Sequence, residues 1–177
     1  MAVISMSHTP NHFETAFENW LIENRIQYVQ VDQRKRAVFV RNKIKSFDFL
    51  LYPAGLDKDT LIVEVKGRTF SGKSLARLGG LQCWVTMEDV RGLLRWEEVF
   101  GKDHAGMFVF VYELANVDID ADGQSVFECD GKRYFFKGLK LSDYSNCMRL
   151  RSQRWQTVMI GADDFRRHAV DLETVLF

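Results

Sequence analysis

The stretch SFDFLLYPAGLDKDTLIVEVKG, residues 46–67, decides the fold, because two apolar runs in it flank a turn-like segment. The runs predict two antiparallel strands joined as a hairpin, and the second run is rich in β-branched residues, as expected of a central strand. A turn centred near Leu56 would bring Asp48 roughly opposite Glu64. Glu64 and Lys66 are two residues apart, so a strand places both side chains on the same face.

Two carboxylates and an ammonium group are thereby expected at the ends of apolar strands. Burying such charges without compensation is costly, whereas a hard cation such as Mg²⁺ is bound by this kind of oxygen cluster. A metal there can polarise a phosphoryl oxygen and activate a bound water, and Lys66 can stabilise charge on a phosphate. The alternative interpretation is a Glu–Lys pair on a solvated sheet face, since an ExK triplet alone is common.

The segments around this hairpin predict a mixed α/β fold: a helix, three or more strands, a helix, a strand and a β-rich extension. Periodic apolar residues predict the first helix over Asn11–Arg25, and a capping box at Thr86–Asp89 predicts a second helix ending near Phe100. Further strands are expected at Ile26–Asp32, Ala37–Arg41, Met107–Leu114, Val117–Asp120, Ser125–Cys129, Lys132–Gly138 and Thr157–Ile160, and short helices at Leu141–Met148 and Ala162–Val170.

Asp48, followed by Glu64-Val65-Lys66, resembles the motif of the PD-(D/E)XK nuclease superfamily. The superfamily has a restriction-endonuclease-like core of a helix, three antiparallel strands, a helix and a strand. The resemblance covers roughly residues 11–115, with the C-terminal third outside it, and Phe47 stands where the motif's name has Pro. It implies that Asp48 and Glu64 bind Mg²⁺, or Mn²⁺ as an alternative, with the Val65 carbonyl as a further ligand. It also implies that Lys66 assists the attacking water.

Many members of this superfamily also carry a glutamate on the first helix. Glu14 fits that position best, because it lies about two turns before Trp20-Leu21, and Glu18, one turn later, is the second choice. The resemblance therefore adds Glu14 to the catalytic residues. A solvated helix face is the alternative interpretation for both glutamates.

A rival motif follows directly, because Gly67–Ser74 fits the GxxxxGK[ST] pattern of a phosphate-binding P-loop. The next residues, LARLGGLQ, are a poor start for a helix, and a P-loop strand belongs in a parallel sheet. The other interpretation of residues 67–80 is a basic loop in which Arg68 and Lys73 meet a phosphate backbone. Asp118–Gly123 begins like a calcium-binding EF-hand loop, but its twelfth place is Cys129, so we expect a hairpin turn.

A second basic and aromatic cluster lies in MRLRSQRW, residues 148–155. Arg149 and Arg151 could grip phosphates while Trp155 stacks on a base, although an ordinary solvated surface explains the same residues equally well. Trp84 and Trp96 are expected in the core.

The composition suits a globular protein of 177 residues, predicted as a single domain, with 24 basic and 24 acidic residues. The zero net charge argues against bulk electrostatic capture of nucleic acid but permits a local basic face. The three scattered cysteines exclude a zinc ribbon and suit a reducing compartment, and no signal peptide or membrane-spanning stretch is evident, so a cytoplasmic protein without a membrane partner is expected.

The leading hypothesis is a Mg²⁺-dependent endonuclease acting on nucleic acid, with DNA as the expected substrate. A non-catalytic nucleic-acid- or protein-binding module on the same fold and a P-loop nucleotide-binding protein are the alternatives. The sequence does not determine the oligomeric state, and a homodimer is one of the options.

Overall fold

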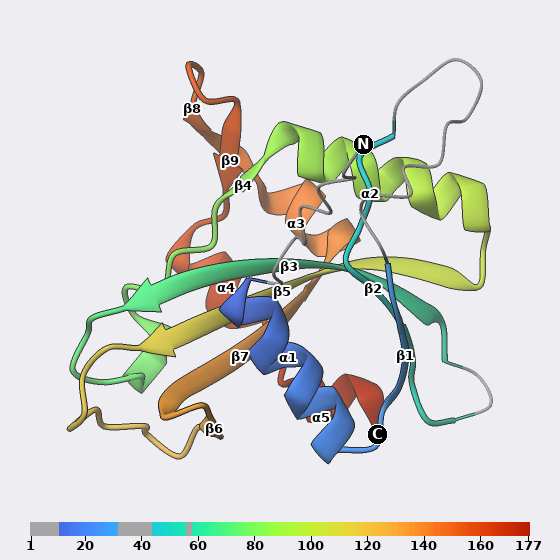
Figure 1. Cartoon of the computed structure of the whole chain (residues 1–177). Coiled ribbons are helices and arrows are strands. Elements are labelled where there is room, and N and C mark those ends of the chain that lie inside the picture. Colours follow the sequence, from blue (N-terminus) through green and yellow to red (C-terminus); the bar gives the residue numbers. More distant parts are fainter. Residues whose placement is uncertain (1–10, 32–43, 56–57) are drawn as a thin grey trace, which may run out of the picture.

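The computed structural model describes residues 11–31, 44–55 and 58–177, whose strands form two sheets with helices packed around them (Figure 1). The predicted strand Ala37–Arg41 lies outside the described residues. The helices are α1 (His12–Glu23), α2 (Met87–Phe100), α3 (Leu141–Cys147), α4 (Ala162–His168) and α5 (Leu172–Leu176), with a 3₁₀ turn, η1, at Ala76–Leu78. The strands are β1 (Gln27–Gln30), β2 (Phe49–Tyr52), β3 (Thr60–Phe70), β4 (Val85–Thr86), β5 (His104–Leu114), β6 (Phe127–Cys129), β7 (Lys132–Lys140), β8 (Arg149–Ser152) and β9 (Thr157–Met159).

The larger sheet has six strands in the order β1-β2-β3-β5-β7-β6. β1, β2 and β3 are antiparallel neighbours, and β5, which follows α2, runs parallel to β3. This arrangement confirms the expected mixed α/β class with its core of helix, three antiparallel strands, helix and strand. β7 adds to the other side of β5, so the C-terminal third of the chain extends the same sheet.

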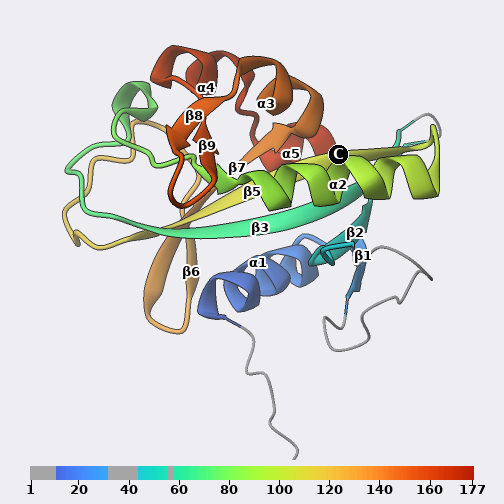
Figure 2. The same ribbon diagram turned by 90° about the horizontal axis from the view of Figure 1, so that it is seen from above.

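Two apolar clusters cover the two faces of the larger sheet. α1 and α5 contribute to one cluster through residues such as Phe17 and Leu172, whereas α2, α3 and α4 contribute to the other through residues such as Leu93, Tyr144 and Phe165. Figure 2 shows α1 and α2 on opposite sides of β3. The small sheet, β4-β9-β8, lies on the α2 side, and its Val85 and Val158 belong to the same cluster as α2.

The alternation of side chains along β3 determines which face carries the charges. Val63 and Val65 are buried with α1, and Ile62 is buried with α2. Because successive strand residues point to opposite faces, Glu64 and Lys66 face α2. The structure therefore confirms that β2 and β3 pair as a hairpin and that Glu64 and Lys66 share one face of the sheet.

The predicted loop after Lys66 is wrong in its first part, because β3 continues through Gly67 to Phe70. Gly67 faces α1, and a Cβ atom at this position would lie only 2.1 Å from Cδ2 of Phe13. Glycine is thus used here for close packing within a strand rather than for a turn. The P-loop interpretation is also wrong, because Gly67–Phe70 belong to strand β3 and the three-residue turn η1, rather than a helix, follows Ser74.

Other differences concern the extension. Val117–Asp120 is a loop rather than a strand, and Asp120 accepts hydrogen bonds from the Ser74 hydroxyl and the Asp122 amide. Strands β5 and β6 flank this loop, so the helices of an EF-hand are absent from it. β8 and α5 were not predicted. The predicted capping box of α2 is confirmed, because the Thr86 side chain accepts from the Asp89 amide and the Asp89 side chain accepts from the Thr86 amide.

Among the described residues, no helix is both long enough and apolar enough to cross a membrane.

Candidate active site

Asp48 lies where β2 and β3 separate. Phe49 pairs with Val63, and the Asp48 amide donates a hydrogen bond to the Val63 carbonyl at 2.9 Å, which sets Asp48 opposite Glu64 as the sequence predicts. One step further, the Val65 amide donates to Asp48 Oδ2 at 2.7 Å. A side-chain carboxylate therefore replaces a strand carbonyl at the end of the β2–β3 ladder.

The two carboxylates are buried, with Asp48 5% and Glu64 6% exposed. Burial, followed by the nearby negative charge of Glu64, raises the pKa of Asp48 from 3.8 to about 7, against the lowering effect of the Val65 amide. The Glu14 carboxylate adds to the increase. The ionised form of Asp48 is therefore disfavoured first by burial and then by two neighbouring carboxylates.

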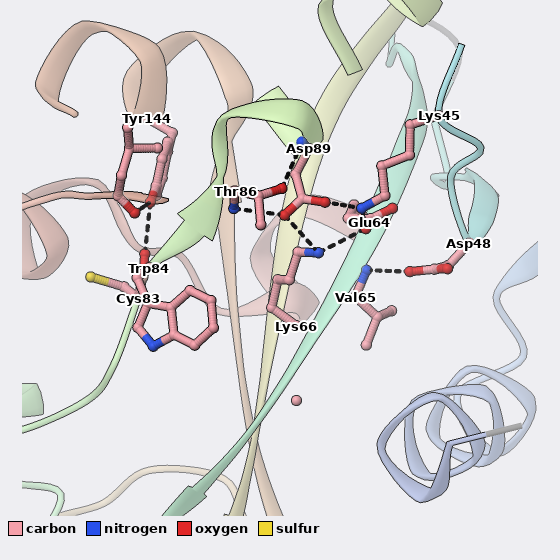
Figure 3. A network of polar contacts seen from close by, with 12 residues as sticks. Lys45, Asp48, Glu64, Val65, Lys66, Cys83, Trp84, Thr86, Asp89 and Tyr144 are labelled. Atoms are coloured by element: carbon pink, nitrogen blue, oxygen red, sulfur yellow. Dashed lines mark hydrogen bonds and ion pairs between the residues drawn. The ribbon is translucent and has the colours of Figure 1, made fainter. Parts of the chain in front are cut away.

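A network of two lysines and two acids continues from Glu64 towards α2 (Figure 3). Glu64 Oε1 accepts from Lys45 Nζ and from Lys66 Nζ, each at 2.8 Å. Lys66 Nζ also lies 2.9 Å from Asp89 Oδ2, and Lys45 contacts the other oxygen of Asp89. Both ammonium groups are thus shared between the same two carboxylates.

Asp89 comes from the first turn of α2 and is 3% exposed. Its carboxylate accepts from the Thr86 amide at 2.8 Å, which completes the capping box. The sequence identifies Asp89 as a capping residue but does not reveal its contact with Lys66, because that contact depends on α2 beginning beside β3. Lys45 was missed for a similar reason, since it precedes β2 without a recognisable motif.

The two glutamates of α1 have different surroundings in the structure. Glu14 is half-buried and close enough to Asp48 to raise its pKa. Glu18 instead accepts a hydrogen bond from the Tyr28 hydroxyl at 2.8 Å. Of the two, Glu14 is therefore the one that the fold brings towards the buried carboxylates.

The Val65 peptide lies between the two acids. The N–H and C=O groups of one strand residue point to the same edge of the strand. Since the Val65 amide points to Asp48, its carbonyl is directed to the same side. This orientation is what a carbonyl ligand beside Asp48 requires.

The donor set suits a divalent hard cation. Asp48, Glu64, Asp89 and Glu14 supply four carboxyl groups against the two ammonium groups of Lys45 and Lys66, which leaves an excess of two negative charges when all are ionised. Mg²⁺ prefers oxygen ligands of this kind and retains several waters. Burial, with the neighbouring Glu64 and Glu14 carboxylates, disfavours the ionised form of Asp48 and raises its pKa, and a bound cation would favour that form.

The predicted nucleic-acid-binding residues lie on β3, on the β8–β9 hairpin and in the loop that follows β3. Arg68 follows Lys66 by two residues and places its guanidinium 3.9 Å from the centre of the Trp84 ring. Arg151 of β8 lies 5.0 Å from the centre of the same ring. Trp84 is therefore a partly exposed link between β3 and β8, and its predicted place in the core is wrong, whereas Trp96 is buried as predicted.

The remaining predicted residues are exposed. Trp155 is 67% exposed in the turn between β8 and β9, with Arg154 against its ring, and Arg149 lies at the start of β8. Lys73 is exposed in the loop beyond β3, and no contact joins it to the buried carboxylates among those found in the described residues.

No protein-family model matches this chain, and no curated protein matches it significantly. Among solved structures, the chain is similar to Hjc, a Holliday junction resolvase from the archaeal hyperthermophile Archaeoglobus fulgidus, with 13% sequence identity and a TM-score of 0.49. The similarity covers 94% of this chain and 98% of that chain.

Proposed function

We propose that this protein is a Mg²⁺-dependent endonuclease that hydrolyses phosphodiester bonds in nucleic acid, with DNA as the expected substrate. One observation carries the proposal: buried Asp48 and Glu64 meet at the end of the β2–β3 ladder, on either side of the Val65 peptide. Lys66 follows on the same strand face as Glu64. This is the arrangement of acids and lysine that the PD-(D/E)XK motif implies.

Asp48, Glu64 and the Val65 carbonyl would hold the metal ion. When bound there, Mg²⁺ would polarise a phosphoryl oxygen and lower the pKa of a coordinated water. Mn²⁺ is a suitable substitute, because carboxylate and carbonyl oxygens bind both ions. A bound ion would also favour the ionised form of Asp48, which burial and the Glu64 charge disfavour.

The chain's own groups then position the substrate. Burial lowers the pKa of Lys66, against the opposing effect of Glu64, so its ammonium releases a proton more readily than an exposed lysine. Lys66 can orient the attacking water or donate to a non-bridging phosphate oxygen. Arg68 lies on the same strand face, where its guanidinium donates to the Gly67 and Trp84 carbonyls, so a contact with a neighbouring phosphate would require it to leave these acceptors.

A cleavage assay tests the proposal. Purified protein is incubated with supercoiled plasmid, with single-stranded DNA, with branched DNA and with RNA, in Mg²⁺, Mn²⁺ or EDTA. We expect cleavage of at least one DNA substrate in either metal and none in EDTA. Glu64→Gln should lower the rate by about 100-fold or more, because it removes a charge that both binds the metal and orients Lys66.

Glu98→Gln is the matched control, because Glu98 is an exposed residue of α2 that pairs with Arg95 rather than with the buried network. Its activity should equal that of the unaltered protein. Full activity of Glu64→Gln, or the absence of cleavage on every substrate, would overturn the proposal. Retarded migration of DNA without any cleavage would instead favour the non-catalytic binding module.

A further inference from the structure

Metal-binding side chains also meet between α3 and α4, apart from the candidate active site. The Sγ atom of Cys147, a carboxylate oxygen of Asp164 and a ring nitrogen of His168 all lie within 4.8 Å of one another. Asp143 Oδ1 lies 3.6 Å from Nδ1 of the same histidine. The four residues are half-buried rather than fully exposed.

The helices determine this convergence. Asp143 and Cys147 are four residues apart on α3, and Asp164 and His168 are four residues apart on α4. Residues at this spacing lie on the same face of a helix, one turn apart.

The chemistry of the three central donors differs from that of the buried carboxylates near β3. A thiolate and an imidazole favour Zn²⁺ over Mg²⁺, and a carboxylate is a third accepted zinc ligand. A carboxylate that contacts a metal-binding histidine commonly fixes the orientation of its ring. Asp143 Oδ1, at 3.6 Å from His168 Nδ1, is near enough to take this role.

We propose that Cys147, Asp164 and His168 bind a Zn²⁺ ion, and that Asp143 positions the His168 ring for this binding. The ion would join the end of α3 to α4. Cys147 ends α3 just before β8, and α4 begins shortly after β9, so the ion would close the base of the β8–β9 hairpin (Figure 1). This role is independent of the proposed nuclease activity.

A cobalt titration tests the site, because Co²⁺ bound by a cysteine thiolate gives a charge-transfer absorption that oxygen ligands alone do not give. We expect the full-length metal-free protein to show this absorption at one equivalent of Co²⁺ and to lose it when Zn²⁺ is added. Cys147→Ser should abolish the band, whereas Cys129→Ser, which alters another half-buried cysteine, should keep it. Asp143→Asn should weaken binding by about 10- to 100-fold, as for other residues that orient a ligand.

Alkylation provides a second measurement, and it uses only the unaltered protein, so it does not depend on whether a variant folds. Zn²⁺ should slow the reaction of Cys147 with iodoacetamide, as followed by mass spectrometry of peptides, and should leave the rate at Cys129 unchanged. Equal rates at Cys147 with and without Zn²⁺, or a cobalt band that survives Cys147→Ser, would overturn the proposal.

Discussion

The Lys66 ammonium lies 2.9 Å from the Asp89 carboxylate, so an ion pair joins the middle of β3 to the first turn of α2. The same carboxylate accepts a hydrogen bond from the Thr86 amide, which completes the helix cap. One side chain therefore fixes where α2 begins and also holds the lysine that the proposed reaction needs.

These two roles of Asp89 can be separated by mutation. Asp89→Asn keeps the size of the side chain but removes the charge that holds Lys66, so the rate of DNA cleavage should fall by about ten-fold. Thr86→Ala removes only the other half of the capping box and should lower the free energy of unfolding by about 1 kcal/mol with little change in cleavage. An equal loss of activity in both variants would show that the cap, rather than the ion pair, matters.

The raised pKa of Asp48 predicts how the metal-free protein responds to pH. The folded protein holds a proton on Asp48 up to about pH 7, whereas the unfolded chain releases it near pH 3.8, so stability should fall as the pH rises between these values. Asp48→Asn cannot ionise and should be more stable than the unaltered protein at about pH 8 in EDTA. Urea unfolding at several pH values measures the difference, and Mg²⁺ should stabilise only the unaltered protein. Identical pH profiles for the two proteins would contradict this account.

The two glutamates of α1 should differ in their effect on activity. Glu14→Gln removes a charge that acts on Asp48 and should lower the rate of cleavage by about ten-fold or more. Glu18→Gln should leave the rate nearly unchanged, because Glu18 is bonded to Tyr28. Single-turnover cleavage at saturating Mg²⁺ provides the comparison, and a larger effect at Glu18 would reverse the assignment.

The β8–β9 hairpin should contribute to DNA binding rather than to the chemical step. Trp155→Ala removes an exposed ring that we expect to stack on a base, so it should weaken binding by about 1–3 kcal/mol. Arg151→Ala should weaken binding and reduce its dependence on salt concentration. Lys132→Ala, at the start of β7, is the control for the loss of one positive charge. Fluorescence anisotropy in Ca²⁺, without cleavage, measures all three, and an equal effect of Lys132→Ala would argue against a specific role for the hairpin.

Gly67→Ala should destabilise the fold, because the added methyl group would collide with the Phe13 ring. The expected loss is about 1–3 kcal/mol, the usual cost of overpacking a core. Gly131→Ala is a contrasting control, since a Cβ atom there meets no neighbour within 4 Å and only the positive φ of 72° opposes it. Chemical denaturation compares the two variants, and an unchanged midpoint for Gly67→Ala would show that α1 can shift at little cost.

The β2–β3 hairpin could be predicted from sequence because two apolar runs rich in strand-forming residues lie close together in the chain on either side of a turn-like segment. Those features also placed Asp48, Glu64 and Lys66 correctly relative to one another. The helix α2 could be predicted because its capping box is local. Each of these predictions depends on residues that are close in the chain.

The errors arise where distant parts of the chain meet. Gly67 indicates a loop when read alone, and only the Phe13 ring of α1 explains a glycine inside β3. Trp84 looks like a core residue until Arg68 and Arg151 are seen against its ring. Asp89 belongs to the network because α2 starts beside β3, which no local pattern expresses.

The hydrogen bond from the Val65 amide to Asp48 has a consequence for how such a protein could change during evolution. A strand amide that loses its acceptor in a buried position destabilises the fold, whatever happens to catalysis. A descendant that no longer needed to cut nucleic acid could discard Glu64 or Lys66 more easily than the acceptor at position 48. We therefore expect inactive descendants to carry Asn or Ser at this position more often than Ala.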